Sequence, residues 1–356
     1  MIFQRGLVRE FAGLSSAVFL TLFAISLTTR LIRLLGQAAG GKIPTEAVLG
    51  FLGFFALYVL PVLLSLTLFV AILLTITRSY RDSEMVIWFS SGLSLAAWLR
   101  PVFAFALPIV ALIATMSLVI SPWAAQRSEQ FRTRVDARDE VSRVTPGVFG
   151  ETSNRERVFF VESITGDETS VRNVFVGSIQ QQRSGIMVSS TGHVETAPNG
   201  DRFLVLGKGR RYEGDPGDAQ YRVMEFERYA MRIDPKEGAQ PEATLKSLPT
   251  LELLRNPVNT NLSELLWRIG VPVSALILAV LAIPLSFVNP RAGRSINLLF
   301  ALLIYVLYSN LISVSQARVA QDRMHFSLGV WLVHAVMLAV VLLMFAHRMG
   351  WLRLRR

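Results

Sequence analysis

The 356-residue sequence has no cysteine and few charged residues. Charged side chains make up 17% of the chain, whereas a soluble protein has roughly a quarter. The lack of cysteine excludes disulfides, thiolate metal sites and a cysteine nucleophile. The four histidines have no metal-ligand spacing, and no phosphate-binding G-x-x-x-x-G-K-[ST] sequence occurs. We therefore expect no metal, no cofactor and no ATP hydrolysis in this chain, so any energy must come from a partner.

Hydrophobic residues, in contrast, make up 52% of the chain and gather in long apolar runs. A run of about 20 residues crosses ~30 Å of hydrocarbon as a helix. We predict six transmembrane helices in two groups of three, at residues 11–35, 48–76, 102–120, 265–288, 296–314 and 326–345. The first run is too long for a signal peptide and no cleavage site follows it. The mid-span charges typical of proton-coupled carriers are absent from this pattern.

The stretch between the third and fourth spans has the character of a β domain. Residues 158–164 and 171–176 are rich in Val, Ile and Phe, and residues 224–227 alternate apolar with charged side chains. Asn199-Gly200 is a strong hairpin signal. We predict an antiparallel β domain of roughly eight or more strands at 123–260. The helical bundle then occupies residues 1–122 and 261–356.

Arginine and lysine in the short loops predict the orientation, because cytoplasmic loops carry an excess of them. With the N-terminus inside, the cytoplasmic set is Arg5, Arg9, Arg78, Arg81, Arg100, Arg291, Arg294, Arg348, Arg353, Arg355 and Arg356. The outer set is smaller and comprises Arg30, Arg33, Lys42, Arg318 and Arg323. Both termini are therefore predicted to be cytoplasmic, and the β domain is predicted to be periplasmic.

The outer set is a candidate site for an anionic lipid. Arg30 and Arg33 share a helix face at the outer end of the first span, and Lys42 follows in the loop. Guanidinium groups bind phosphates through two hydrogen bonds, although snorkelling to ordinary headgroups is the alternative. Arg318 and Arg323 would extend this basic site, unless one of them pairs with the adjacent Asp322.

The loop between the second and third spans predicts a short cytoplasmic helix at about 80–92. Asp82 or Ser83 is suited to its start and Gly92 to its end. One acid and an aromatic anchor suit docking into an ATPase groove, and an interfacial helix resting in the headgroups is the alternative. The candidate coupling residues are Arg81, Ser83, Glu84, Ile87 and Trp88.

Two apolar surfaces have a functional and a structural interpretation. A stripe of the fifth span would be either the wall or gate of a cavity or ordinary interhelical packing. The inward strand faces would line either a lipid groove or a plain core. The candidate gate residues are Tyr305, Tyr308 and Ile312, and the candidate groove residues are Phe160, Phe175, Met224 and Phe226.

Several motifs resemble those of the lipopolysaccharide export permeases, the LptF/LptG family. Residues 78–94, which begin RSYRDSEM and end SGLS, are similar to the cytoplasmic loop of that family. LLWRI at 265–269, AIPLS at 282–286 and PRAGR at 290–294 resemble its fourth span and the exit from it. RLIRLLG at 30–36, with Ile43-Pro44, is more similar to LptF than to its paralogue LptG. The resemblance covers nearly the whole chain.

The resemblance implies a bacterial inner-membrane subunit of an ABC transporter that extracts lipopolysaccharide. The expected partners are LptG, a dimer of the ATPase LptB, which would bind ATP and magnesium, and LptC. Glu84 is expected to meet a basic residue of LptB, and the outer arginines are expected to contact the lipid. The β domain is expected to be a jellyroll. The alternatives are LptG itself, or a mechanotransmitting ABC subunit that carries no substrate through its spans.

Overall fold

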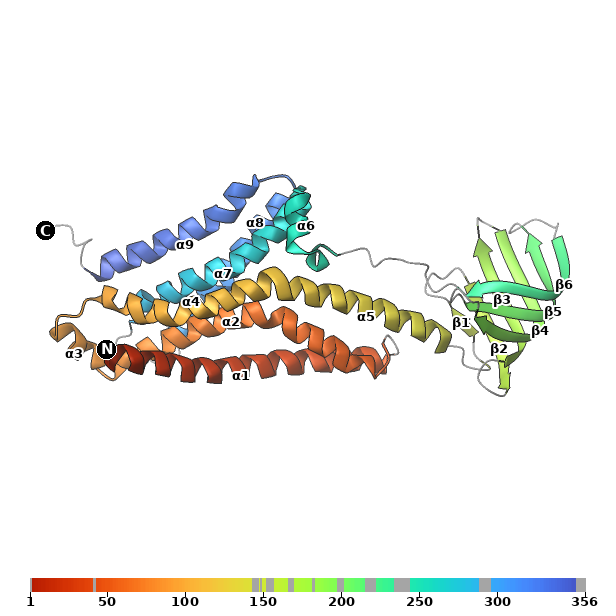
Figure 1. The fold of residues 1–356 in the computed structure, drawn as a ribbon, viewed down its shortest axis with the longest axis horizontal. Coiled ribbons are helices and arrows are strands. Elements are labelled where there is room, and N and C mark those ends of the chain that lie inside the picture. The colour runs from red at the N-terminus through yellow and green to blue at the C-terminus, as the bar shows by residue number, and fades with distance from the viewer. Residues whose placement is uncertain are drawn as a thin grey trace. The chain divides into compact units, whose positions relative to one another are not determined.

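The structure is a computed structural model that divides into two units, residues 1–130 with 243–356, and residues 131–242. It describes residues 2–40, 43–142, 147, 149–151, 157–165, 170–180, 183–196, 202–214, 222–233, 244–287 and 296–349. The first unit is helical, and the second contains a β sheet together with the end of a helix that begins in the first unit (Figure 1). The predicted fold class, a helical bundle with an inserted antiparallel β domain, is confirmed.

Six helices in the described ranges are long and apolar enough to cross a membrane, as predicted. They are α1 (Ile2–Ala39), α2 (Ala47–Arg81), the continuous helix containing α4 (Leu99–Thr115) and α5 (Ser121–Ser142), α7 (Asn259–Leu285), α8 (Ile296–Ala320) and α9 (Phe326–Arg348). Shorter elements are α3 (Glu84–Ser90), η1 (Leu95–Trp98), η3 (Leu245–Ser247) and α6 (Thr250–Arg255). A π-helical stretch, η2 (Met116–Ile120), interrupts the third span.

Helices α2 and α7 form the centre of the bundle, and their contact surface is the apolar core. Phe69, Ile72, Leu278 and Ala282 are fully or almost fully buried there. Helix α1 packs on α2 and α4, whereas α9 packs on α7 and α8 at the opposite edge (Figure 1). The outer faces of α1 and α8 expose leucine and isoleucine, which suits contact with hydrocarbon or with another apolar helix.

The β unit is one six-stranded antiparallel sheet in which strands pair in sequence order. The strands are β1 (Phe149–Glu151), β2 (Arg157–Thr165), β3 (Ser170–Gln180), β4 (Arg183–Thr196), β5 (Arg202–Gly214) and β6 (Arg222–Ile233). Strands β2 to β6 are 9 to 14 residues long, so the described part of the domain uses fewer strands than the eight or more predicted.

A row of irregular residues crosses the sheet and shifts the alternation of its side chains. Asn173 of β3 and Lys208 of β5 have positive φ angles of 50° and 48°. Val171 and Val174 therefore pack in the same core although they are three residues apart, where a regular strand would place them on opposite faces. The apolar side chains thus stay on the core face across the irregularity.

Gly209 of β5 lies beside this row and gives the first testable prediction. A Cβ at this position would collide with the carbonyl oxygen of Val188 and come within 2.6 Å of the Phe226 ring. Gly209→Ala should destabilise the β sheet by about 1–3 kcal/mol, as overpacking does. Hydrogen exchange of β4–β6 peptides in the full-length protein measures this loss.

Gly177→Ala in β3 is the matched control, because its Cβ would find only ordinary contacts at 3.7 Å or more. This variant should exchange hydrogen at a rate close to that of the parent. Equal protection of the Gly209 variant and the Gly177 variant would contradict the packing account of the sheet.

Candidate functional sites

The α1–α2 hairpin carries two charged sites at its opposite ends. At one end the Arg78 guanidinium of α2 bonds the Glu10 carboxylate of α1 at 2.7 Å. At the other end the Arg30 guanidinium lies over the Phe55 ring, 5.2 Å from its centroid. The stretch of α1 between Glu10 and Arg30 rises about 30 Å at ~1.5 Å per residue. This length matches the hydrocarbon core of a bilayer, so the two sites belong to opposite membrane surfaces.

Arg30 has an unsatisfied donor, which suits an anionic ligand. Its Nε atom is shielded from solvent and has no hydrogen-bond partner among the described residues. Leaving such a donor unpaired is costly, and a phosphate or carboxylate oxygen would satisfy it. Arg33 is exposed one turn further along α1. Lys42, the third predicted member of this basic group, lies outside the described residues.

Arg318 and Arg323 form a separate basic group at the end of α8. The backbone N–H of Arg323 donates to the Arg318 carbonyl at 2.9 Å, and both side chains are exposed. No ion pair in the described part of the chain joins either arginine to Asp322. This pair lies at the α8–α9 edge of the bundle and Arg30 lies at the α1 edge (Figure 1). One subunit alone therefore does not bring the two basic groups together.

The predicted cytoplasmic helix corresponds to α3, which has an exposed apolar face. Ile87 and Val86 are each 68% exposed, whereas Trp88 is half-buried and packs against the bundle core. Glu84 begins the helix, and Arg81 is exposed at the end of α2. The face open to a partner thus combines aliphatic side chains with a carboxylate.

The ends of α3 use positive φ angles. Ser83 occupies the N-cap position at φ 59°, but its side chain makes no capping hydrogen bond, so the cap predicted for Asp82 or Ser83 is not formed by the Ser83 hydroxyl. Gly92 follows the helix at φ 88°, a conformation that glycine adopts without strain. Its N–H donates to the Phe89 carbonyl at 3.0 Å, so Gly92 helps to end the helix as predicted.

One guanidinium joins α3 to the rest of the bundle. Arg78 lies 3.5 Å from Glu84 and 3.9 Å from Asp82, in addition to its contact with Glu10. Three carboxylates therefore share a single arginine, and the cluster has an excess of negative charge. This excess favours a basic residue of a partner beside Glu84.

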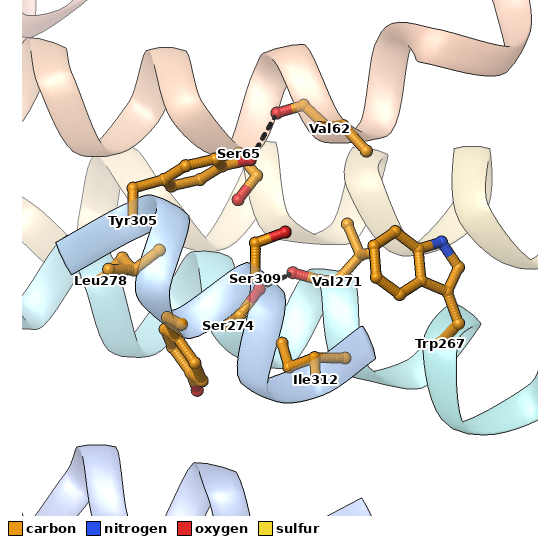
Figure 2. A pocket seen from close by; sticks show the side chains of 10 residues that line it. Val62, Ser65, Trp267, Val271, Ser274, Leu278, Tyr305, Ser309 and Ile312 are labelled. Atoms are coloured by element: carbon orange, nitrogen blue, oxygen red, sulfur yellow. Dashed lines mark hydrogen bonds between the residues drawn. The ribbon is translucent and has the colours of Figure 1, made fainter. Parts of the chain in front are cut away.

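The predicted gate residues line a small cavity among α2, α7 and α8 (Figure 2). The Tyr305 hydroxyl donates to the Val62 carbonyl at 3.2 Å, and Tyr308 and Ile312 are buried. The cavity measures about 20 Å³, which is room for roughly one water molecule and far too little for a lipid. The three predicted gate residues therefore do not enclose a lipid site within this chain.

The four predicted groove residues lie on two faces of the sheet. Phe160 and Phe175 are directly paired and share one face, where Phe149 packs 4.8 Å from Phe160. Phe226 belongs to the core on the other face, and Met224 lies two residues from it along β6. The structure therefore brings the four side chains together only as two pairs.

The sequence analysis missed a buried ion pair in α7. Arg268 and Glu264 are joined at 3.1 Å, with side chains 3% and 8% exposed. Arg268 lies near the start of the predicted fourth span, where the sequence analysis named it only as part of the LLWRI motif. The signal was available in the sequence, because an acid and an arginine four residues apart share a helix face.

Six apolar helices, an inserted β domain and an exposed loop helix define a membrane protein of the permease class. The family model "Lipopolysaccharide export system permease LptF/LptG" matches residues 5–347, so the chain belongs to this family. LptF proteins of Escherichia coli strain K12 and Shigella flexneri are each 27% identical to it. Those matches span 348 residues, 97% of this chain and 94% of each relative. The chain is therefore an inner-membrane permease of the lipopolysaccharide export system.

The second testable prediction concerns Arg78. Arg78→Gln should leave the bundle folded but raise hydrogen exchange in α3, because the ionic links from α2 to Glu84 and Glu10 are lost. The ion pairs are partly exposed, so the loss of global stability should stay within about 1 kcal/mol. Arg81→Gln is the matched control, since Arg81 lies on the same helix end outside this cluster. Unchanged exchange in the Arg78 variant would refute the link.

Proposed function

We propose that this chain is the LptF-type half of the lipopolysaccharide transporter. It pairs with LptG to enclose a cavity that receives the lipid from the outer leaflet of the inner membrane. The observation that carries the proposal is the exposed face of α3, which presents Ile87 and Val86 beside Glu84 at the membrane surface opposite Arg30. A loop helix of this kind suits docking by a separate ATPase.

The energy comes from LptB in this proposal. An LptB dimer binds ATP and magnesium, and it binds α3 with a basic residue placed beside Glu84. Both chain termini and α3 lie in the cytoplasm, and the β domain lies in the periplasm. LptC completes the assembly and accepts lipid from the β domain, whose apolar faces include Phe160 with Phe175 and Met224 with Phe226.

The separation of the basic groups supports a two-subunit cavity. Arg30 and Arg33 lie at the α1 edge, and Arg318 and Arg323 lie at the α8–α9 edge. In a pseudo-twofold pairing, a contact of one edge with an unlike edge of the partner is repeated in reverse on the other side of the axis. We infer such a pairing here. The α1 edge of each subunit then faces the α8 edge of its partner, so basic groups from both chains surround the lipid phosphates. Tyr305, Tyr308 and Ile312 of α8 lie next to this contact between the two subunits.

LptG is the second candidate, because both branches share this family. Capture of the endogenous partner separates the two, since an LptF-type subunit retrieves LptG and an LptG-type subunit retrieves LptF. A mechanotransmitting subunit that carries no lipid through its spans is the third candidate. Lipopolysaccharide retained on the purified complex argues against it.

The third testable prediction is the charge reversal Glu84→Arg. This change should abolish co-purification with LptB or uncouple ATP hydrolysis from export, because like charges then meet at the docking site. The fold should be retained, since Glu84 is only half-buried. Glu252→Arg, in α6 and away from α3, controls for a general effect of reversing a carboxylate. Export at the parental rate by the Glu84 variant would refute the assigned role.

The fourth testable prediction is the double reversal Arg30→Glu with Arg33→Glu. It should weaken retention of lipopolysaccharide by about tenfold or more, because charge-assisted hydrogen bonds contribute ~1.5–3 kcal/mol each. Assembly with the partner subunits should be unchanged. Arg100→Glu, which lies in the proposed cytoplasmic set, is the control and should retain lipid normally. Loss of assembly instead of lipid would indicate a structural role for the pair.

A further inference from the structure

A buried arginine in α7 holds three separate parts of the helical unit. The Arg268 Nε donates to Glu264 at 3.1 Å, and one terminal nitrogen donates to the Thr250 hydroxyl at 2.8 Å. The other terminal nitrogen donates to the carbonyls of Leu245 and Lys246, each at 3.3 Å. A buried guanidinium is costly unless its donors are bonded, and these four acceptors engage all three nitrogens of Arg268, which is almost fully buried.

The main chain of Arg268 is also bonded, for a reason visible in the sequence. Pro272 follows four residues later and has no N–H, so the Arg268 carbonyl lacks its usual helical donor. The Ser117 hydroxyl of η2 fills this place, donating to the Arg268 carbonyl at 3.0 Å. Arg268 therefore contacts the third span through its backbone and the α6 region through its side chain.

The π-helical stretch η2 closes the connection between these parts. A π-helix shifts the backbone hydrogen-bond pattern from i→i−4 to i→i−5 and often marks a functional site. The Thr250 hydroxyl donates to the Leu118 carbonyl in the middle of η2, while accepting from Arg268. Ser117, Arg268, Thr250 and Leu118 thus form a ring of hydrogen bonds, here called the Arg268 ring, that joins η2, α7 and α6.

The Arg268 ring joins the two segments that lead to and from the β unit. The chain leaves the helical unit for the β unit after Gln130 and re-enters it at Ala243. Leu118 lies in the outgoing helix, and Leu245 to Thr250 follow directly on the return. We call the third span, which continues as a helix to the end of the helical unit, the outgoing connector, and the segment from Leu245 to Thr250 the returning connector. The ring bonds both connectors to the same residue of α7.

We propose that Arg268 is a positioning residue that couples the transmembrane bundle to both connectors of the β unit. Movement of α7 is then transmitted to the two connectors together, since neither can shift without breaking the Arg268 ring. This role extends the proposed function only in its last step, where the movement drives lipid into the β domain. The existence of the Arg268 ring concerns this chain alone, so it can be tested on the purified chain without a transport assay.

The natural absence of cysteine makes a direct measurement practical. Spin labels at Val119→Cys and Leu251→Cys occupy exposed positions next to Leu118 and Thr250. In the otherwise unchanged protein, the two labels should lie close together at one well-defined distance. Their spectrum should therefore show strong dipolar broadening. Thr250→Val removes the bridging hydroxyl at nearly constant shape and should reduce this broadening. Ser117→Ala breaks the other side of the ring and should have the same effect.

Thr115→Val is the matched control, because its hydroxyl bonds only the Ala111 carbonyl within the same helix. It should leave the broadening unchanged. Parental broadening in both the Thr250 and the Ser117 variants would overturn the ring. If Thr250→Val also lowers the melting temperature strongly, the Ser117 variant decides, because the Ser117 hydroxyl bonds the main chain of Arg268 and not its buried guanidinium.

The coupling step is measured in the reconstituted transporter with its ATPase. Thr250→Val should raise the ATP hydrolysed per lipopolysaccharide released by roughly fivefold, the lower range of coupling between sites. A second outcome is that the variant loses the dipolar broadening but keeps the parental ratio of ATP hydrolysed to lipopolysaccharide released. That result would support the existence of the ring in the parent and overturn its role in coupling. Absence of lipopolysaccharide transport by the parent itself would contradict the proposed function and not the ring, since the spin-label result does not depend on transport.

Discussion

The bundle depends on one constraint, which is that backbone polar groups in hydrocarbon need partners within the protein. Helices meet this demand along most of their length, and the exceptions are where this chain becomes specific. Pro272 leaves the Arg268 carbonyl without a helical donor, and the Leu118 carbonyl lies in the π-helical stretch η2. Both carbonyls accept a hydrogen bond from a hydroxyl of another segment. Local breaks in helical bonding thus determine which segments of the bundle are joined.

The same constraint explains how much of the fold was predictable. Six spans follow from hydropathy, since an apolar run in a membrane has almost no alternative to a helix. The β domain was predictable in kind, but its strand count was not. Asn173 and Lys208 adopt positive φ and shift the alternation of side chains within long strands. The two-residue pattern of apolar side chains is therefore interrupted inside one continuous strand, which makes it look like two.

The functional residues divide in a similar way. Arg30 stood out because it contradicts the charge bias, and Glu84 stood out as the acid of a predicted short cytoplasmic helix. Their contacts with Phe55 and Arg78 were not predictable, since they join helices that are distant in sequence. Arg268 left a readable signal in Glu264 and Pro272, each four residues away. The ring it forms also required Thr250 and Ser117, which no pattern in the sequence connects.

In the proposed function, a force applied by the ATPase at one membrane surface reaches the other through the charged contacts. At the α3 end, Arg78 links the loop helix to α1 and α2 through weak, partly exposed ion pairs, which can rearrange when a partner's basic residue competes for Glu84. At the connector end, Arg268 is fully enclosed and its bonds are costly to break. In the proposed cycle, a loose contact where the ATPase docks and a stiff one at the connectors would let the bundle move as a unit. Helices α2 and α7, which pack on each other, are the path between them.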